Sequence, residues 1–261
     1  MTSPDPFEPI AAVARPWLHM MPQDDGPRPD GEAVMPLSQV VASATLAEAI
    51  ERHRRGRFGV DACARASASV WSKSLFSAVL PAQMLAALAG GAPDPDPPLL
   101  VVDGLPKATL ALPPAGLDGP PALEALAAWT ADTLGHLAIA ALARQSGLAT
   151  RLFWSNAATM MAFLCEKWDD VPAVAGRSVA LRNALFACEP LRGQISYVPT
   201  PVPAYPTMRR RRLCCLRDRV GQRLCTGCPK IADDERDAVL AAVAAGLPLP
   251  APTAPSKRPT G

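Results

Sequence analysis

The sequence has few aromatic residues and almost no net charge. Aromatic residues make up 5% of its 261 residues, whereas hydrophobic residues together make up 49%. The core must therefore be built mainly from Ala, Leu and Val. The formal net charge is +2, which is too small to indicate a protein that binds nucleic acid. The length favours one or two domains.

Targeting and membrane-spanning segments are also not expected. The sequence begins MTSPDPFEPI, in which Asp5 and Glu8 precede the first basic residue, Arg15, and no apolar run follows. This pattern is unlike a secretory signal. No stretch approaches the roughly 18 continuous apolar residues of a membrane span. We therefore expect a cytoplasmic protein without a transmembrane segment, in which thiols stay reduced and clustered cysteines more often bind a metal than form disulfides.

Nucleotide-binding motifs are missing as well. The sequence has no G-x-G-x-x-G after a predicted strand and no Walker loop. Its histidines, His19, His53 and His136, are scattered along the chain. The sequence therefore predicts neither a nicotinamide site nor a nucleotide site.

Cysteines are concentrated in one short basic segment. Four of the seven lie in RRRRLCCLRDRVGQRLCTGCPK, where Cys214 and Cys215 are adjacent and Cys225 and Cys228 form a C-x-x-C. Thiolates are soft ligands that suit zinc and iron–sulfur clusters, and four of them complete either one tetrahedral zinc or a [2Fe–2S] cluster. Adjacent cysteines in a strand point to opposite sides, so the backbone must turn there for both to reach one site. This demand favours the wider two-iron cluster, and zinc stays open as the alternative.

The arrangement of these cysteines resembles the ferric iron (ferric siderophore) reductase family, which has Cys-Cys, a spacer and Cys-x-x-Cys near the C-terminus. The arginine run before the first pair and Pro229 after the last cysteine are similar to the family too. Less specific similarity extends to SVWSKSLFSAVLP from Ser69 and LFWSNAATMMAFL from Leu152. The chain departs from the family in its spacer, Leu216 to Leu224, which has nine residues where the family has ten.

The resemblance implies a function and a set of ligands. Cys214, Cys215, Cys225 and Cys228 would carry a [2Fe–2S] cluster, and the protein would reduce ferric siderophore iron to ferrous iron by one-electron transfer, releasing it in the cytoplasm. Its partners would be the ferric siderophore and an external electron donor, such as a ferredoxin, a flavoprotein or a small reductant, but not nucleic acid. The residues alone leave open a zinc-stabilised binding module that contacts nucleic acid or an acidic protein through its basic segment. A siderophore synthetase, distantly similar to this family, would need nucleotide-binding residues that the sequence lacks.

Positive charge around the cysteines has two interpretations. A cluster held by four thiolates is anionic, so neighbouring arginines and Lys230 would favour its reduced form. The same arginines form a solvated basic loop or attract an anionic partner. Candidate substrate contacts are Arg210, Arg211, Arg212, Trp154 and Tyr205, although Trp154 also fits ordinary core packing.

The expected fold is mainly α with a small β element (α+β), ending in a compact cysteine-rich module. We expect a loosely ordered lead-in over residues 1–36, a mainly helical body over 37–188, a proline-rich extended connector over 189–208, the cluster-binding module over 209–230, and a short helix with a disordered tail over 231–261. The body contains LLVVDGLPKATLAL, in which Asp103-Gly104 predicts a β-hairpin near residues 99–112.

Helical periodicity and turn residues predict the individual helices. They are expected over Leu37–Arg55, over Ser67–Leu88 with a break at Pro81, over Leu123–Gln145 with Gly147 as C-cap, from Ser155 or Asn156 through Trp168, over Ser178–Cys188 and over Asp233–Ala245. In the fourth of these the expected inner face is Met160, Phe163, Leu164 and Trp168.

Overall fold

The computed structural model describes residues 33–102, 104–108, 120–171 and 174–251. This part of the chain is mainly α-helical with two small antiparallel sheets, which confirms the predicted fold class. The helices are α2 Leu37–Val40, α3 Ser43–Phe58, α4 Ala64–Leu88, α5 Leu123–Trp129, the π-helical η1 Thr130–Ile139, α6 Ala140–Ser146, α7 Thr150–Asp169, α8 Ala175–Ala187, the 3-10 helix η2 Arg217–Val220 and α9 Asp233–Ala244. The strands are β1 Ala33–Pro36, β2 Pro98–Val102, β3 Leu105–Ala108, β4 Ile195–Pro199 and β5 Thr207–Arg211.

Helix α4 is the central element of the helical body. It packs against α3, α7 and β3, and it runs without a break through Pro81. The predicted break at this proline was therefore wrong. A proline inside a helix costs about 3 kcal/mol through a lost hydrogen bond and a steric clash. Leu80, Met84 and Leu85 beside it are almost fully buried. Burial of these side chains stabilises the continuous helix and offsets the cost of the proline.

The segment from α5 to α6 is one continuous helical run whose middle turns are π-helical. It ends at Gly147, which has the left-handed φ of 66° predicted for the C-cap. A Cβ at Gly135, in the π-helical part, would lie 2.9 Å from the Trp154 ring, so glycine allows α7 to pack closely here. Of the described helices, this run alone is long and apolar enough to cross a membrane by length and composition. Half of its most apolar window is buried in the protein.

Helix α7 begins at Thr150, five residues before the predicted cap at Ser155. The prediction failed because the polar side chains of Ser155 and Asn156 are buried and make tertiary hydrogen bonds rather than local ones. Leu164 and Trp168 lie on the buried face as predicted. The other two residues of the predicted inner face, Met160 and Phe163, are only partly buried.

The first sheet has the order β1-β2-β3 and contains the predicted hairpin. Val102 pairs with Leu105 around Gly104, whose φ is 76°. Glycine is also required by space, because a Cβ would lie 2.8 Å from the Ala49 carbonyl oxygen. Strand β1 falls inside the segment expected to be loosely ordered, so that expectation was wrong for residues 33–36. Residues 1–32 and the predicted hairpin end at 109–112 lie outside the described residues.

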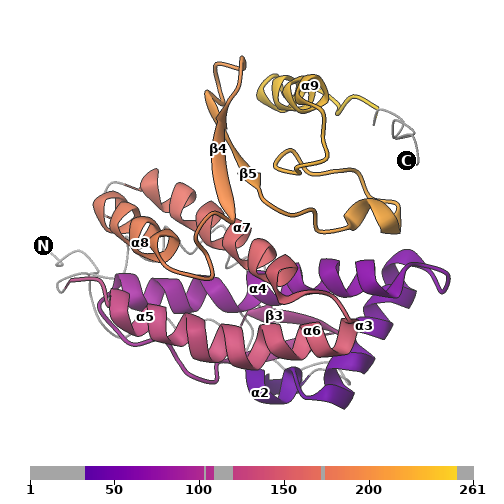
Figure 1. Ribbon diagram of the computed structural model, residues 1–261, viewed down its shortest axis with the longest axis vertical. Coiled ribbons are helices and arrows are strands. Elements are labelled where there is room, and N and C mark those ends of the chain that lie inside the picture. Colours follow the sequence, from indigo (N-terminus) through magenta and orange to yellow (C-terminus); the bar gives the residue numbers. More distant parts are fainter. Residues whose placement is uncertain (1–32, 103, 109–119, 172–173, 252–261) are drawn as a thin grey trace, which may run out of the picture.

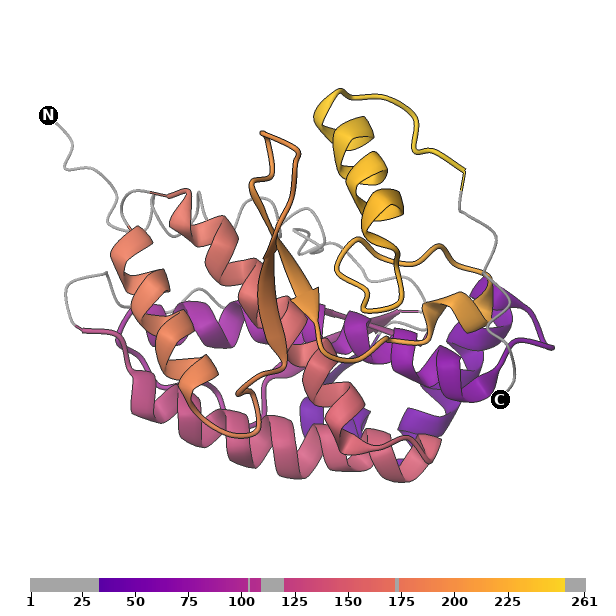
Figure 2. The same cartoon turned by 45° about the horizontal axis from the view of Figure 1, so that its top comes forward.

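The second sheet is a two-stranded ribbon of β4 and β5, and it lies mostly in the segment predicted as a proline-rich extended connector. Its register pairs Ile195 with Arg211 and Pro199 with Thr207. The prolines of this segment gather from Pro199 onward, in the turn and at the strand ends, so they do not interrupt the ladder. In Figure 1 the ribbon rises from α7 beside α9. Figure 2 shows the same two elements standing over the layer of body helices.

Candidate metal centre

The cysteine segment follows β5 directly and lies between the ribbon, α4 and α9. Cys215 and Cys228 are almost fully buried, whereas Cys214 and Cys225 are partly exposed. After Cys215 the backbone turns at Leu216, a non-glycine residue in the left-handed region with φ 60°. The Leu216 amide then donates to the Cys214 sulfur at 3.4 Å. This turn allows two adjacent cysteines to face one region.

The four thiols interact with one another in a row. Cys214 interacts with Cys228, Cys228 also with Cys225, and Cys225 with Cys215. These interactions place the four cysteines near one another, and their role as ligands stays a prediction. Within the described residues no three His, Cys, Asp or Glu side chains are arranged to hold a single metal ion.

The C-x-x-C forms a tight turn against the ribbon. The Cys228 amide donates to the Cys225 carbonyl at 2.9 Å, and the Arg211 amide donates to the Gly227 carbonyl at 2.9 Å. A Cβ at Gly227 would lie 2.5 Å from the Arg209 carbonyl oxygen. Only glycine allows this turn to approach β5, and that approach places the second cysteine pair beside the first.

Thiol–thiol hydrogen bonds divide the cysteines into two acidic and two proton-holding groups. The bond with Cys215, followed by that with Cys228, holds the pKa of the Cys225 thiol well below its usual range. The bond with Cys228 lowers the pKa of Cys214 to about 7, with help from the Leu216 amide. The same bonds raise the pKa of Cys215 and Cys228. These contacts favour the thiolate form of Cys225 and Cys214 over that of their partners, and the thiolate is the form that binds metals.

A buried arginine lies beside the thiols. Arg211 is 2% exposed, and its Nη2 donates to Asn156 Oδ1. Its Nε has no hydrogen-bond partner, and no carboxylate pairs with it in the described part of the chain. After the thiol–thiol bonds, the charges of Arg211 and Lys73 also favour the thiolate form of Cys225. A buried cation without a carboxylate is costly, so negative charge at the cysteines stabilises it.

Asn156 connects this arginine to the helical body. Its Nδ2 donates to the Ser69 carbonyl at 3.0 Å and to Ser72 Oγ at 2.9 Å, both on α4, while its Oδ1 accepts from Arg211. One residue earlier, Ser155 Oγ accepts from the Leu213 amide at 3.3 Å. Two neighbouring side chains of α7 thus anchor the chain on either side of the entry to the cysteine segment. No sequence motif indicates this role.

The candidate substrate contacts lie apart from one another. Arg211 is buried against Asn156 as described, and Arg210 reaches the Pro229 carbonyl at 3.4 Å and Asp233 at 3.9 Å. Arg212 is exposed. Trp154 is buried against the π-helical segment, whereas Tyr205 lies in the turn of the ribbon, its amide donating to the Val202 carbonyl at 2.8 Å. These side chains do not form one binding surface.

No protein-family model matches the chain, and no curated protein matches it either. The side chains of the cysteine segment show which kind of bound group they suit. Four soft sulfur donors lie near a buried guanidinium that has no carboxylate partner among the described residues, and this set fits an anionic, thiolate-ligated group.

Proposed function

We propose that the protein is an iron–sulfur oxidoreductase that reduces ferric siderophore iron to ferrous iron. Cys214, Cys215, Cys225 and Cys228 would hold the [2Fe–2S] cluster, which supplies single-electron transfer when bound. The observation that carries the proposal is the position of Arg211, which is buried beside Cys215 and Cys225 and has no carboxylate partner among the described residues. An anionic cluster would balance that charge, whereas a neutral packing role would leave it uncompensated.

The protein's own residues would tune and expose the centre. Arg211 and Lys73 place positive charge beside Cys225, which favours the more negative, reduced state and raises the reduction potential. The amides of the turns add hydrogen bonds to sulfur, as at Cys214, and act in the same direction. Partial exposure of Cys214 and Cys225 gives the centre a short route to the protein surface.

The reaction would need one electron for each iron. An external donor, such as a ferredoxin, a flavoprotein or a small reductant, supplies the electron, and the chelated Fe(III) accepts it to become Fe(II). Siderophores hold iron through hard oxygen donors, which bind the softer, less charged Fe(II) weakly. The iron then passes to cellular ligands in the cytoplasm, and no acid–base residue is needed for the electron step itself.

Metal analysis of the anaerobically purified protein tests the cofactor. We expect about two irons and about two acid-labile sulfides per chain, with a reddish chromophore. One zinc and no sulfide would refute the proposal and favour the zinc-stabilised binding module.

An iron-release assay tests the activity. The dithionite-reduced protein is mixed with ferric hydroxamates and ferric catecholates in the presence of a ferrous trap. We expect the trap to capture iron from at least one chelate faster than dithionite alone releases it. No protein-dependent release from any chelate would refute the siderophore reductase.

A further inference from the structure

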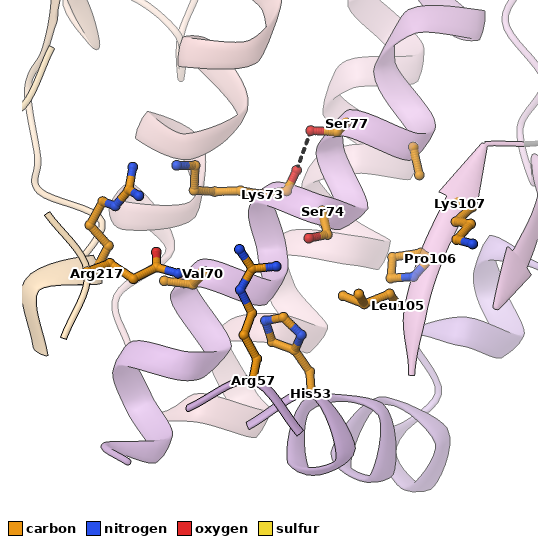
Figure 3. Close-up of a pocket in the computed structure, with 12 residues that line it drawn as sticks. His53, Arg57, Val70, Lys73, Ser74, Ser77, Leu105, Pro106, Lys107 and Arg217 are labelled. Carbon is orange, nitrogen blue, oxygen red and sulfur yellow. Dashed lines mark hydrogen bonds between the residues drawn. The ribbon is translucent and has the colours of Figure 1, made fainter. Parts of the chain in front are cut away.

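A pocket rich in positive charge lies beside the cysteine segment. It has a volume of about 330 Å3 and is lined by side chains that include His53, Arg57, Lys73, Ser74, Lys107 and Arg217. Figure 3 shows His53 and Arg57 rising from α3 toward Ser74 on α4, with Leu105 and Pro106 of β3 on one side and Arg217 of η2 on the other. The described residues that line it include no Asp or Glu.

Among the described residues, the cations of this pocket have no carboxylate partner. Lys73 and Lys107 make no salt bridge in the described part of the chain, and the contact found for Arg57 is with the Phe58 ring, 5.9 Å from its centroid. By contrast, Arg54 on the same helix as Arg57 pairs with Glu51 at 2.6 Å. Unpaired like charges around one hollow repel each other, so the pocket gains stability when an anion enters it.

Two buried nitrogen atoms around the pocket also lack partners. His53 is 4% exposed, and neither its Nε2 nor the buried Nε of Arg217 has a hydrogen-bond partner in the part of the chain that the structure describes. Each buried polar group left unsatisfied costs about 1–3 kcal/mol. Burial, followed by the charge of Arg57, lowers the pKa of His53, so the neutral ring can donate a hydrogen bond without adding charge. Oxygen atoms of a ligand would satisfy both nitrogens.

The pocket adjoins the candidate metal centre. Arg217 follows Cys215 by two residues, in a short helix that packs on α4. Lys73 lines the pocket and also acts electrostatically on Cys215 and Cys225. A ligand held in the pocket would therefore lie next to the thiols.

We propose that this pocket binds negatively charged oxygen donors of the ferric chelate, so that the protein selects anionic chelates of the catecholate or carboxylate type over neutral or cationic hydroxamates. This inference rests on the proposed reductase function and names the substrate class for it. The volume is at the small end of ligand-binding sites, so the pocket takes one arm of a chelate rather than the whole complex. The oxygen atoms of that arm would pair with the cations and accept hydrogen bonds from the unsatisfied donors.

Binding of redox-inert gallium(III) chelates to the cluster-loaded protein tests this inference without electron transfer. Tryptophan fluorescence or calorimetry gives the dissociation constants of an anionic gallium tris-catecholate and of a cationic gallium trihydroxamate. We expect the anionic complex to bind at least about 10-fold more tightly, with the difference shrinking as salt is added. Arg57→Met and Lys107→Met should each weaken anionic binding by about 5-fold or more, and the exposed Lys167→Met on α7 should leave it unchanged.

Equal affinity for the two chelates, or Arg57→Met and Lys107→Met proteins that bind the anionic one normally, would overturn the inference. Inorganic phosphate that competes as strongly as the catecholate complex would overturn it too, because the pocket would then be a general phosphate site. Circular dichroism and the visible spectrum show whether each variant is folded and loaded. Charge-selective gallium binding without any ferrous release supports the pocket and refutes the reductase, whereas release with charge-indifferent binding does the reverse.

Discussion

Replacing Asn156 with leucine would remove the side chain that joins α4, α7 and β5. The change deletes hydrogen bonds to the Ser69 carbonyl and Ser72 Oγ, each worth about 1 kcal/mol net. It also leaves Arg211 buried without its acceptor, which adds about 1.5–3 kcal/mol for a charged group. We therefore expect Asn156→Leu to lower the free energy of unfolding by about 3.5–5 kcal/mol.

Urea unfolding of the anaerobically purified protein, followed by far-ultraviolet circular dichroism, measures this loss. Asn183→Leu is a matched control, because Asn183 is exposed on α8, and it should change stability by less than about 0.5 kcal/mol. A double-mutant cycle with Arg211→Met isolates the pair, and we expect a coupling energy of about 1.5–3 kcal/mol. A coupling below about 0.5 kcal/mol would refute the idea that Asn156 holds the arginine.

Three further predictions concern the cysteine segment. Gly227→Ala should reduce the bound iron by more than about half, because its Cβ would lie 2.5 Å from a β5 carbonyl oxygen; Gly56→Ala, with open space around it, should keep full iron content, and equal iron in both variants would contradict the steric argument. Cys225→Ser should lose or strongly shift the visible absorbance while helical circular dichroism is retained, and Cys63→Ser, an exposed cysteine on the body, should change neither; an unaltered spectrum in Cys225→Ser would remove it from the ligand set. In metal-free protein, alkylation of Cys214 should rise through pH about 7, the pKa to which its hydrogen bond with Cys228 lowers it, so the thiolate's contribution to stability is lost as pH falls through 7; a midpoint near the ordinary 9.0 would show that this hydrogen bond is not made.

The helices that could be predicted are those whose apolar spacing is matched by burial. In α3, Leu46, Ala49 and Ile50 are buried as their spacing indicates. The break expected at Pro81 did not occur, because tertiary packing of α4 outweighed a local penalty. Strand β1 was missed for a related reason. Ala33–Pro36 has no alternating pattern of its own, and it becomes a strand because β2 offers it a hydrogen-bonding edge.

Some features of the candidate site could be predicted from the sequence and others could not. Cysteine spacing predicts the ligand set, since the residues lie within one segment and the chemistry is specific to thiols. The anchor at Asn156 and the pocket could not be predicted, because Arg57, Lys73 and Lys107 come from three elements with no common motif. Asn156 resembled a helix cap in the sequence, and only the packing of α4 against α7 shows its buried partners.

The nine-residue spacer between the cysteine pairs contributes to two neighbouring sites, the candidate metal centre and the basic pocket. It begins with the left-handed Leu216, forms η2, turns again at Gly221 with φ 72°, and is pinned by Lys230, whose Nζ lies 2.9 Å from Asp218. The length of the spacer limits how far apart the two thiol pairs lie. Its first helical residue, Arg217, lines the basic pocket. Lengthening or shortening this loop would move the thiols and the pocket wall together, so the two sites can change only in step.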